Sequence, residues 1–203
     1  MPDFGDLMIG DSRIFALAVL SVDIRGFTKL SLELQRDIPR LARMQALYLS
    51  EMSAVIRDMG GVTEKYTGDG VLGLFGTESD TTGNTDASRA VQAALWINLV
   101  LKRSLNPVLR ELGLPEIGCG QGVDYGPVYI EKVGLRGENQ FSLAGPTVSL
   151  AAKMQGVSPA GGITIGRDVY NRLPSDWQKY ATRPPQAWSY PYEAFGFTAA
   201  WSE

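Results

Sequence analysis

Two aspartates stand at positions where a metal ion or a phosphate group could approach closely. Asp69 lies between Gly68 and Gly70, and the runs of β-branched and aromatic residues on either side predict a β-hairpin with its turn here. The flanking glycines leave the carboxylate without bulky neighbours. Asp23 follows the apolar residues 15–22, which predict a strand buried on both faces.

The residues after Asp23 predict a turn that leads into a helix. A carboxylate at a strand end, beside a helix N-terminus, suits a site for a metal ion and a polyphosphate. The carboxylate binds the cation, and the free N–H groups of the first helical turn face the anion. On the residues alone, a simpler interpretation stays open, in which Asp23 caps a helix and Asp69 only forms a turn. The candidate phosphate-binding amides are those of Gly26, Phe27 and Thr28.

The composition narrows the chemistry that these acids could serve. The chain has no histidine, which excludes histidine general bases, Ser-His-Asp triads and histidine-containing zinc sites. Oxygen ligands therefore dominate, and these favour magnesium or manganese. The single cysteine, Cys119, excludes an intrachain disulfide and favours a cytoplasmic protein.

Charge and hydropathy indicate which partners to expect. A net charge of −3 gives no long-range attraction for nucleic acid or an anionic membrane. An anionic substrate would therefore need a bound metal or a local basic pocket. The acidic N-terminus does not resemble a signal peptide, and no apolar run is long enough to span a membrane.

The elements expected to position the acids form one domain of 14–203 after a leader of 1–13. Their order predicts an α+β fold with a central, mostly antiparallel sheet covered by helices. The expected helices cover 28–59 (one or two, the second starting at Pro39), 86–112 (kinked or split by Pro107), a stretch from Pro146 past Lys153, and 167–173. The expected strands cover 15–22, 62–66 and 70–75, a hairpin of 117–123 and 128–133 turning at 124–127, then 141–143 and 163–165.

The C-terminal segment after Pro185 is rich in aromatic residues. It could form the last strands of the sheet or a strip that faces a partner. Packing is the favoured interpretation, because aromatic side chains are buried more often than they are functional. The residues concerned are Trp188, Tyr190, Tyr192, Phe195, Phe197 and Trp201.

Three motifs, taken together, resemble the catalytic domain of the class III nucleotidyl cyclases. They are Val-Asp-Ile-Arg-Gly-Phe-Thr at 22–28, Lys-Tyr-Thr-Gly-Asp-Gly at 65–70, and Gly-Pro-Thr-Val-Ser-Leu-Ala-Ala-Lys at 145–153. One motif alone would be weak, but three in the family's order, within roughly residues 14–172, are a strong signal. The resemblance implies a ferredoxin-like core. It also implies a head-to-tail homodimer with sites shared between subunits.

The resemblance assigns roles to individual residues. Two Mn²⁺ or Mg²⁺ ions per site would be bound by Asp23, Asp69 and the backbone carbonyl of Ile24. The ribose 3′-hydroxyl of a nucleoside triphosphate would then attack its own α-phosphate in line, giving a 3′,5′-cyclic nucleotide and pyrophosphate. Lys65 and Ser142 match the base-reading positions.

The match is incomplete at three positions. Ser149 stands where the family usually has the asparagine that orients the ribose. Lys153 replaces the arginine that stabilises the pentavalent phosphate, which keeps the charge but loses the bidentate fork. Gly120 stands where a phosphate-binding arginine is frequent. These losses keep a non-catalytic, nucleotide-binding dimerisation module open as an alternative. Because Asp23 and Asp69 are both present, a working cyclase with catalytic Ser149 and Lys153 is favoured.

The length, the Ser149/Lys153 pair and the aromatic tail resemble the stand-alone pyrimidine cyclases of bacterial antiphage systems. This implies production of cyclic UMP or cyclic CMP for a downstream effector protein that senses it. UTP is favoured slightly because the ammonium of Lys65 suits a carbonyl better than an amino group. Since Lys65 also suits an adenine nitrogen, an adenylate cyclase is the alternative. Candidate residues for narrowing a pyrimidine pocket are Tyr48, Trp96 and Arg103, although core packing is the better interpretation for the first two.

Overall fold

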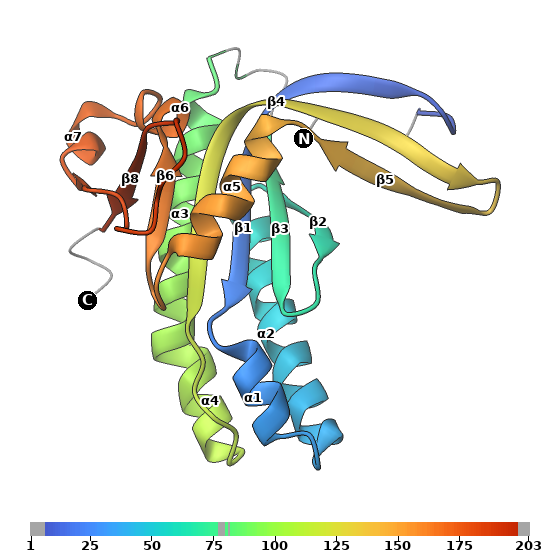
Figure 1. Cartoon of the computed structure of the whole chain (residues 1–203), viewed down its shortest axis with the longest axis vertical. Helices are drawn as coiled ribbons and strands as arrows, with labels where there is room; N and C mark the ends of the chain where they lie inside the picture. Colours follow the sequence, from blue (N-terminus) through green and yellow to red (C-terminus); the bar gives the residue numbers. More distant parts are fainter. Residues whose placement is uncertain (1–6, 77–79, 81, 199–203) are drawn as a thin grey trace.

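In the computed structural model, residues 7–76, 80 and 82–198 are described, and they form a sheet of eight strands with helices on both faces (Figure 1). The strand order is β2-β3-β1-β4-β6-β8-β7, and β5 pairs with β4. All pairs are antiparallel except β4 with β6. The strands are β1 Ser12–Ile24, β2 Val62–Tyr66, β3 Gly70–Phe75, β4 Cys119–Leu135, β5 Glu138–Ala144, β6 Ile163–Gly166, β7 Ala181–Thr182 and β8 Ala194–Phe197.

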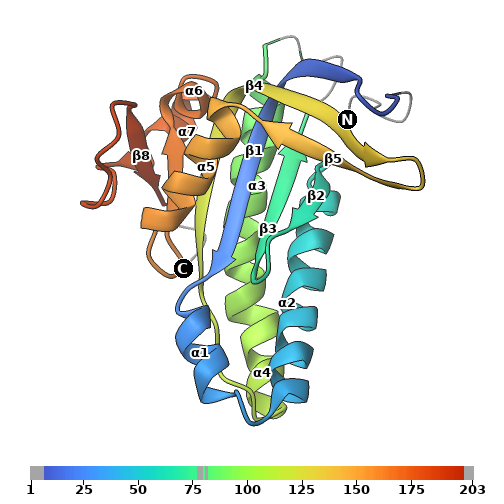
Figure 2. The ribbon, with the colours of Figure 1, turned by 45° about the vertical axis from the view of Figure 1, so that its right-hand side comes forward.

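The helices divide between the two faces of this sheet. Figures 1 and 2 show α2 and α3 on one face and α5 alone on the other. The bounds are α1 Phe27–Glu33, α2 Ile38–Asp58, α3 Asn84–Val100, the π-helix η1 Leu101–Leu105, α4 Asn106–Glu111, α5 Pro146–Val157, α6 Arg167–Tyr170 and α7 Ser175–Gln178. Within the described ranges, none of these helices is both long and apolar enough to cross a membrane.

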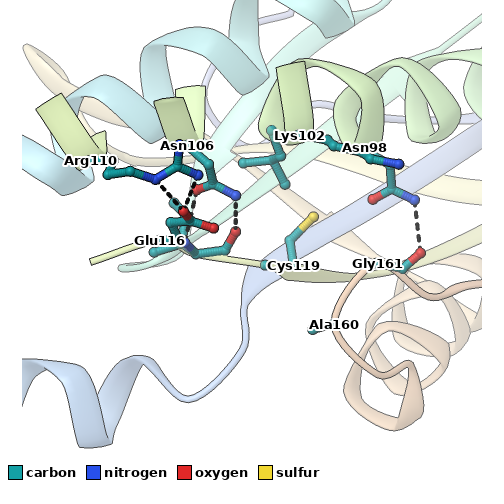
Figure 3. Close-up of a pocket in the computed structure, with 11 residues that line it drawn as sticks. Asn98, Lys102, Asn106, Arg110, Glu116, Cys119, Ala160 and Gly161 are labelled. Carbon is teal, nitrogen blue, oxygen red and sulfur yellow. Dashed lines mark hydrogen bonds and ion pairs between the residues drawn. The ribbon is translucent and has the colours of Figure 1, made fainter. Parts of the chain in front are cut away.

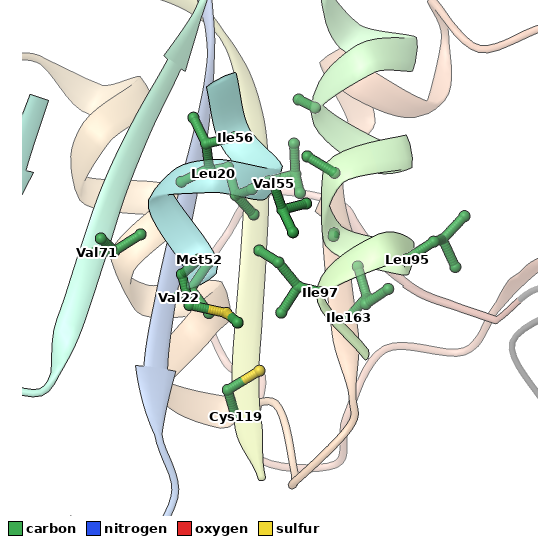
Figure 4. Close-up of a cluster of buried hydrophobic side chains, with 14 of the residues drawn as sticks. Leu20, Val22, Met52, Val55, Ile56, Val71, Leu95, Ile97, Cys119 and Ile163 are labelled. Atoms are coloured by element: carbon green, nitrogen blue, oxygen red, sulfur yellow. The ribbon is translucent and has the colours of Figure 1, made fainter. Parts of the chain in front are cut away.

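Strand β1 is buried on both faces from Leu17 onward, as its apolar sequence predicted, whereas its first residues are exposed. Leu20 and Val22 belong to the larger core, which they form with side chains of α2 and α3 such as Met52 and Ile97 (Figure 4). Leu17, like other odd-numbered residues of β1, belongs to a second cluster with residues of α5. A strand that is hydrogen-bonded on both edges and covered on both faces is a rigid base for whatever follows its end.

Helix α2 begins and ends close to where the sequence predicted. Pro39 lies in its first turn, and the side chain of Asp37 caps it by accepting a hydrogen bond from the Arg40 amide. Gly60, with φ of +81°, follows its end. The buried stripe consists of Met44, Tyr48, Met52, Val55 and Ile56.

The hairpin predicted over residues 117–133 is wrong. From Cys119 onward these residues belong to the single strand β4, which pairs with β1 over residues 119–131. Asp, Gly and Pro at 124–127 suggested a turn, but β4 passes straight through them. At these residues β4 has left β6, which pairs with 121–123, and has not yet met β5, which pairs from Tyr129 onward. Pro127 therefore sits where one edge of the strand is open and a missing N–H breaks no ladder.

The helix predicted over residues 86–112 is split, as expected at Pro107, but by an additional element. A π-helical turn, η1, separates α3 from α4, and Pro107 lies in the first turn of α4. Proline lacks an N–H and its ring clashes with the carbonyl four residues earlier. The wider π-helical turn just before Pro107 accommodates the missing hydrogen bond and the proline ring.

Both ends of the described chain pack against the sheet. Leu7 is buried, and its carbonyl accepts a hydrogen bond of 3.0 Å from Lys132 Nζ. Of the segment expected to be a leader, the described residues from Leu7 onward thus pack on the fold. At the other end Phe197 is buried in β8, and the Tyr192 hydroxyl donates to Asp124 at 2.8 Å. The packing interpretation of the aromatic tail is therefore confirmed for these residues, whereas Trp201 lies outside the described residues.

Gly122 of β4 is expected to control how closely α5 packs on the sheet. A β-carbon at this position would overlap the backbone of Ala151 and Gln155. We expect Gly122→Ala to lower the free energy of unfolding by about 1–3 kcal/mol, since the helix must move. Urea denaturation of the purified variant measures this change.

Gly156→Ala is the matched control, on α5 itself. No other atom lies within 4 Å of a β-carbon at Gly156. Alanine should therefore stabilise the helix by about 0.5–1 kcal/mol. Equal effects of the two substitutions would contradict the close packing described for Gly122.

Candidate active site

The two predicted metal-binding acids lie side by side at the ends of neighbouring strands. Asp23 of β1 is paired with Gly70 of β3, and the Ile24 amide donates to the Asp69 carbonyl at 3.3 Å. Besides burial, the negative charge of Asp69 acts on the Asp23 carboxyl group and raises its pKa. The structure thus brings Asp23, Ile24 and Asp69 together at one edge of the sheet.

The turn that carries Asp69 is fixed from two directions. The Thr67 amide donates to the Gly70 carbonyl at 2.9 Å, and Gly68 has φ of +78°, which favours glycine. From α2, Gln45 Nε2 donates to the Gly68 carbonyl at 2.7 Å. A β-carbon on Gly70 would lie 2.8 Å from Asp23 Oδ1, so this glycine leaves room for the Asp23 carboxylate.

The electrostatics of the acid pair favour a bound cation. Burial raises the pKa of Asp23 to about 6, the neighbouring charge of Asp69 acts in the same direction, and the charge of Arg25 opposes both. At neutral pH two carboxylates thus repel each other in a half-buried place. A divalent cation between them would remove that repulsion.

The donor set fits magnesium or manganese. It consists of two carboxylates and the backbone carbonyl of Ile24, all of them oxygen ligands. Over the described residues, no group of three or more cysteine, aspartate or glutamate side chains gathers at one point. A hard cation held by so few protein ligands completes its coordination with water and with phosphate oxygens of a substrate, as Mg²⁺ usually does.

The predicted phosphate-binding turn has the expected backbone. Gly26 is the N-cap of α1 with φ of +72°, and no side chain caps the helix. The first amide bonded within α1 is that of Leu30, which donates to the Gly26 carbonyl at 3.0 Å. The amides of 27–29 therefore precede the helical ladder. Thr28 is exposed and Phe27 packs against the larger core.

Arg25 is the residue of this site to which the sequence analysis assigned no role. Its guanidinium group lies over Gly120, the residue paired with Asp23 on β4, where a β-carbon would overlap it. Arg25 Nη2 donates to the backbone carbonyl of Gln155 in α5. Gly120 lacks the arginine that is frequent at this position, and the space beside it holds Arg25, from the turn that follows β1. The strand register brings the two residues together, and neighbouring residues in the sequence give no sign of it.

Lys65 lies on the face of the sheet that α5 covers, because its paired residue Leu72 belongs to the cluster on that face. Ser142 of β5 points to the opposite face, because its two neighbours in the strand belong to that cluster. Lys65 lines a cavity of about 390 Å³ with Leu74, Ile130, Phe141 and Leu143. Ser142 lies between the last two of these but is not among the lining residues.

On α5, Ser149 and Lys153 point outward, because Ala151 and Met154 occupy the buried side. Among the described residues, no hydrogen bond or ion pair links the side chain of Lys65, Ser149 or Lys153 to either acid. Their roles remain predictions.

The residues suggested as pocket fillers are not near Lys65. Tyr48 is fully buried in the larger core, which confirms the packing interpretation. Trp96 belongs to α3 and Arg103 to η1, on the sheet face opposite α5. These residues therefore do not line the cavity beside Lys65.

A further cavity, of about 490 Å³, lies beside the start of β4, and its lining side chains have structural contacts (Figure 3). Asn106 makes two hydrogen bonds of 2.9 Å to the backbone of Ile117, and Arg110 pairs with Glu116. Asn98 donates to the Gly161 carbonyl at 2.8 Å. These side chains hold the segment that leads into β4, beside the strand end that carries the acids.

Comparison with known proteins agrees with this arrangement. Residues 11–186 match the family described as the adenylate and guanylate cyclase catalytic domain. The chain belongs to this family. A solved structure, that of the adenylyl cyclase CyaB from P. aeruginosa, has the same fold, with a TM-score of 0.79 and 25% identity over 94% of this chain and 97% of that one. The expected class III cyclase fold is thus confirmed.

Two curated relatives carry different activity names. A protein from Anabaena cylindrica named adenylate cyclase is 30% identical over 79% of this chain, which spans only 31% of that relative. A protein from Burkholderia cepacia named uridylate cyclase is 29% identical over 89% of this chain and 77% of its own length. The family is therefore established, and the substrate is not decided by it.

The raised pKa of Asp23 gives a test of the acid pair. We expect ¹³C NMR titration of the metal-free protein to place the pKa of Asp23 near 6. Asp69→Asn should lower it, because the like charge is removed, although burial still holds it above the ordinary value. Since the folded state keeps this proton while the unfolded chain loses it, the wild type should lose stability as pH rises from about 4 through 6.

Asp58→Asn, at an exposed acid on α2, is the control and should leave the pKa of Asp23 unchanged. An identical pKa of Asp23 in the wild type and in Asp69→Asn would show that the two acids do not interact.

Proposed function

We propose that this protein is a nucleotidyl cyclase that converts UTP to 3′,5′-cyclic UMP and pyrophosphate. The observation that carries the proposal is the adjacency of Asp23 and Asp69 at the ends of β1 and β3, inside a cyclase-family fold. The name of the relative from Burkholderia cepacia supports UTP as the substrate.

Each residue at the acid edge, by which we mean residues 23–28 together with Asp69, has a place in this reaction. Asp23, Asp69 and the Ile24 carbonyl would hold Mg²⁺ or Mn²⁺, two ions per site. Bound there, the metal lowers the pKa of the ribose 3′-hydroxyl and neutralises the triphosphate. The backbone amides of Gly26, Phe27 and Thr28 bind phosphate oxygens at the start of α1.

The remaining residues act from a second copy of the chain. Lys65 and Ser142 contact the base, Ser149 the ribose, and Lys153 the charge that develops on the α-phosphate. Their placement supports this division, since Lys65, Ser149 and Lys153 are exposed and free of side-chain contacts to the acids of their own chain. A head-to-tail homodimer would then hold two identical sites.

The cavity next to Lys65 supports recognition of a flat base. Apolar side chains form most of its wall, and Lys65 supplies an ammonium donor at its edge. A uracil carbonyl accepts that hydrogen bond, and so does a ring nitrogen of adenine. ATP is therefore the second candidate substrate, favoured by the name of the relative from Anabaena cylindrica. The proposed biological role is synthesis of a second messenger in cytoplasmic antiphage defence, sensed by a separate effector.

Incubation of the purified protein with each of the four ribonucleoside triphosphates and Mn²⁺ tests the proposal. We expect cyclic UMP as the main product. Asp23→Asn should lower its formation at least ~100-fold, because the electrostatic clamp on the phosphates is lost. Asp58→Asn should retain full activity. Formation of cyclic AMP alone would show that the substrate is ATP and not UTP. Tight nucleotide binding without any cyclic product would show that the chain is a non-catalytic nucleotide-binding module.

Mixing two inactive variants tests the shared site. Asp23→Asn and Lys153→Ala should each be inactive alone, whereas an equal mixture should recover roughly a quarter of wild-type activity. Half of the dimers are then mixed, and each mixed dimer has one intact site. Absence of recovery, with mixed dimers demonstrated by differently tagged chains, would place both residues in a site built from a single chain.

A further inference from the structure

Arg25 is a half-buried cation that the fold does not neutralise. It makes no ion pair with any carboxylate among the described residues, and its Nε, which is buried, has no hydrogen-bond partner there. The one hydrogen bond of its side chain runs from Nη2 to the neutral carbonyl of Gln155. A buried donor without a protein partner is costly, so it is satisfied by a water molecule, a bound ion or a ligand.

Gly120 makes the room in which this cation lies, and Gly70 makes room for the neighbouring Asp23 carboxylate. Gly70 and Gly120 are the residues paired with Asp23 on either side, so the three positions form one row across β3, β1 and β4. Side chains of directly paired residues point to the same face. Because Gly120 has no side chain, the guanidinium of Arg25 can lie in that row beside the acid.

Two structural roles must be weighed against a role in binding. The Gln155 carbonyl is near the C-terminal end of α5, where a cation stabilises a helix. The positive charge also lowers the pKa of Asp23. Neither role uses the Nε donor, and a lysine would serve both.

We propose that Arg25, whose guanidinium fills the space beside Gly120, is a substrate-binding residue that contacts the polyphosphate chain of the nucleotide. This inference rests on the proposed function and deepens it. In the sequence, Arg25 lies between Ile24, a proposed metal ligand, and Gly26, the first residue of the proposed phosphate-binding turn. A planar guanidinium with several N–H donors matches phosphate oxygens better than any other side chain. It also supplies the local positive charge that a chain of net charge −3 needs for an anionic substrate.

The test uses inorganic triphosphate with Mn²⁺, which carries no base and no ribose. By isothermal titration calorimetry we expect Arg25→Gln to weaken triphosphate binding about 10–100-fold, with Arg25→Lys between it and the wild type. Mn²⁺ binding without phosphate, followed by electron paramagnetic resonance, should stay within about twofold. Arg57→Gln, at an exposed arginine of α2, is the matched control and should bind triphosphate as the wild type does.

A relocated guanidinium separates binding from helix capping. The double variant Arg25→Gly/Gly120→Arg places the group on β4 and should recover most of the triphosphate affinity lost in Arg25→Gln. Wild-type affinity in Arg25→Gln would overturn the inference. So would a loss of Mn²⁺ binding as large as the loss of triphosphate binding, since Arg25 would then act through Asp23. Should Arg25→Gln not fold, equal triphosphate affinities of Arg25→Lys and the wild type would overturn it.

The outcome is separable from that of the cyclase assay. Weakened triphosphate binding in Arg25→Gln, in a protein that forms no cyclic nucleotide, would support the inference and overturn the proposed function. An active cyclase whose KM for UTP is unchanged by Arg25→Gln would do the reverse.

Discussion

The pairing of β1 with a strand on each side is the constraint on which the site depends. It places Gly70, Asp23 and Gly120 in one row and brings the turn at Asp69 against the end of β1. The two outer positions must be glycine, because a side chain at either would collide with Asp23 or with the Arg25 guanidinium. The ladder thus determines both which groups meet and how much space they have.

The acid edge is a place where stability and function conflict. Asp23 is half-buried beside another carboxylate, and its raised pKa means that ionisation at neutral pH works against the fold. The neighbouring strands compensate for this: β1 is covered on both faces, and α2 holds the turn through Gln45. Such a local conflict, supported by rigid surroundings, is common where a protein binds charged ligands.

Much of the fold could be predicted because its signals are local. The apolar run before Asp23, the glycines around Asp69 and the caps of α2 each identify an element from neighbouring residues. The continuity of β4 could not be predicted, because Asp, Gly and Pro in 124–127 are turn formers in isolation. Only the change of partner strands along β4 explains why they stay extended.

The same limit applies to the site. Asp23 and Asp69 were found from their own neighbours in sequence, whereas Arg25 acquires its environment from Gly120 and Gln155, far along the chain. Strand register is the missing information, and it is set by the whole sheet.

The length of β4 also determines where the chain can accept extra residues. An epitope tag or a fluorescent protein inserted at 124–127 would interrupt the strand that joins the start of β4 to the β4–β5 arm. The two-residue connection at Arg136 and Gly137 is a true hairpin end, where Gly137 has φ of +91° and a β-carbon would meet no other atom within 4 Å. For imaging or biosensor fusions, that exposed tip is the site of choice.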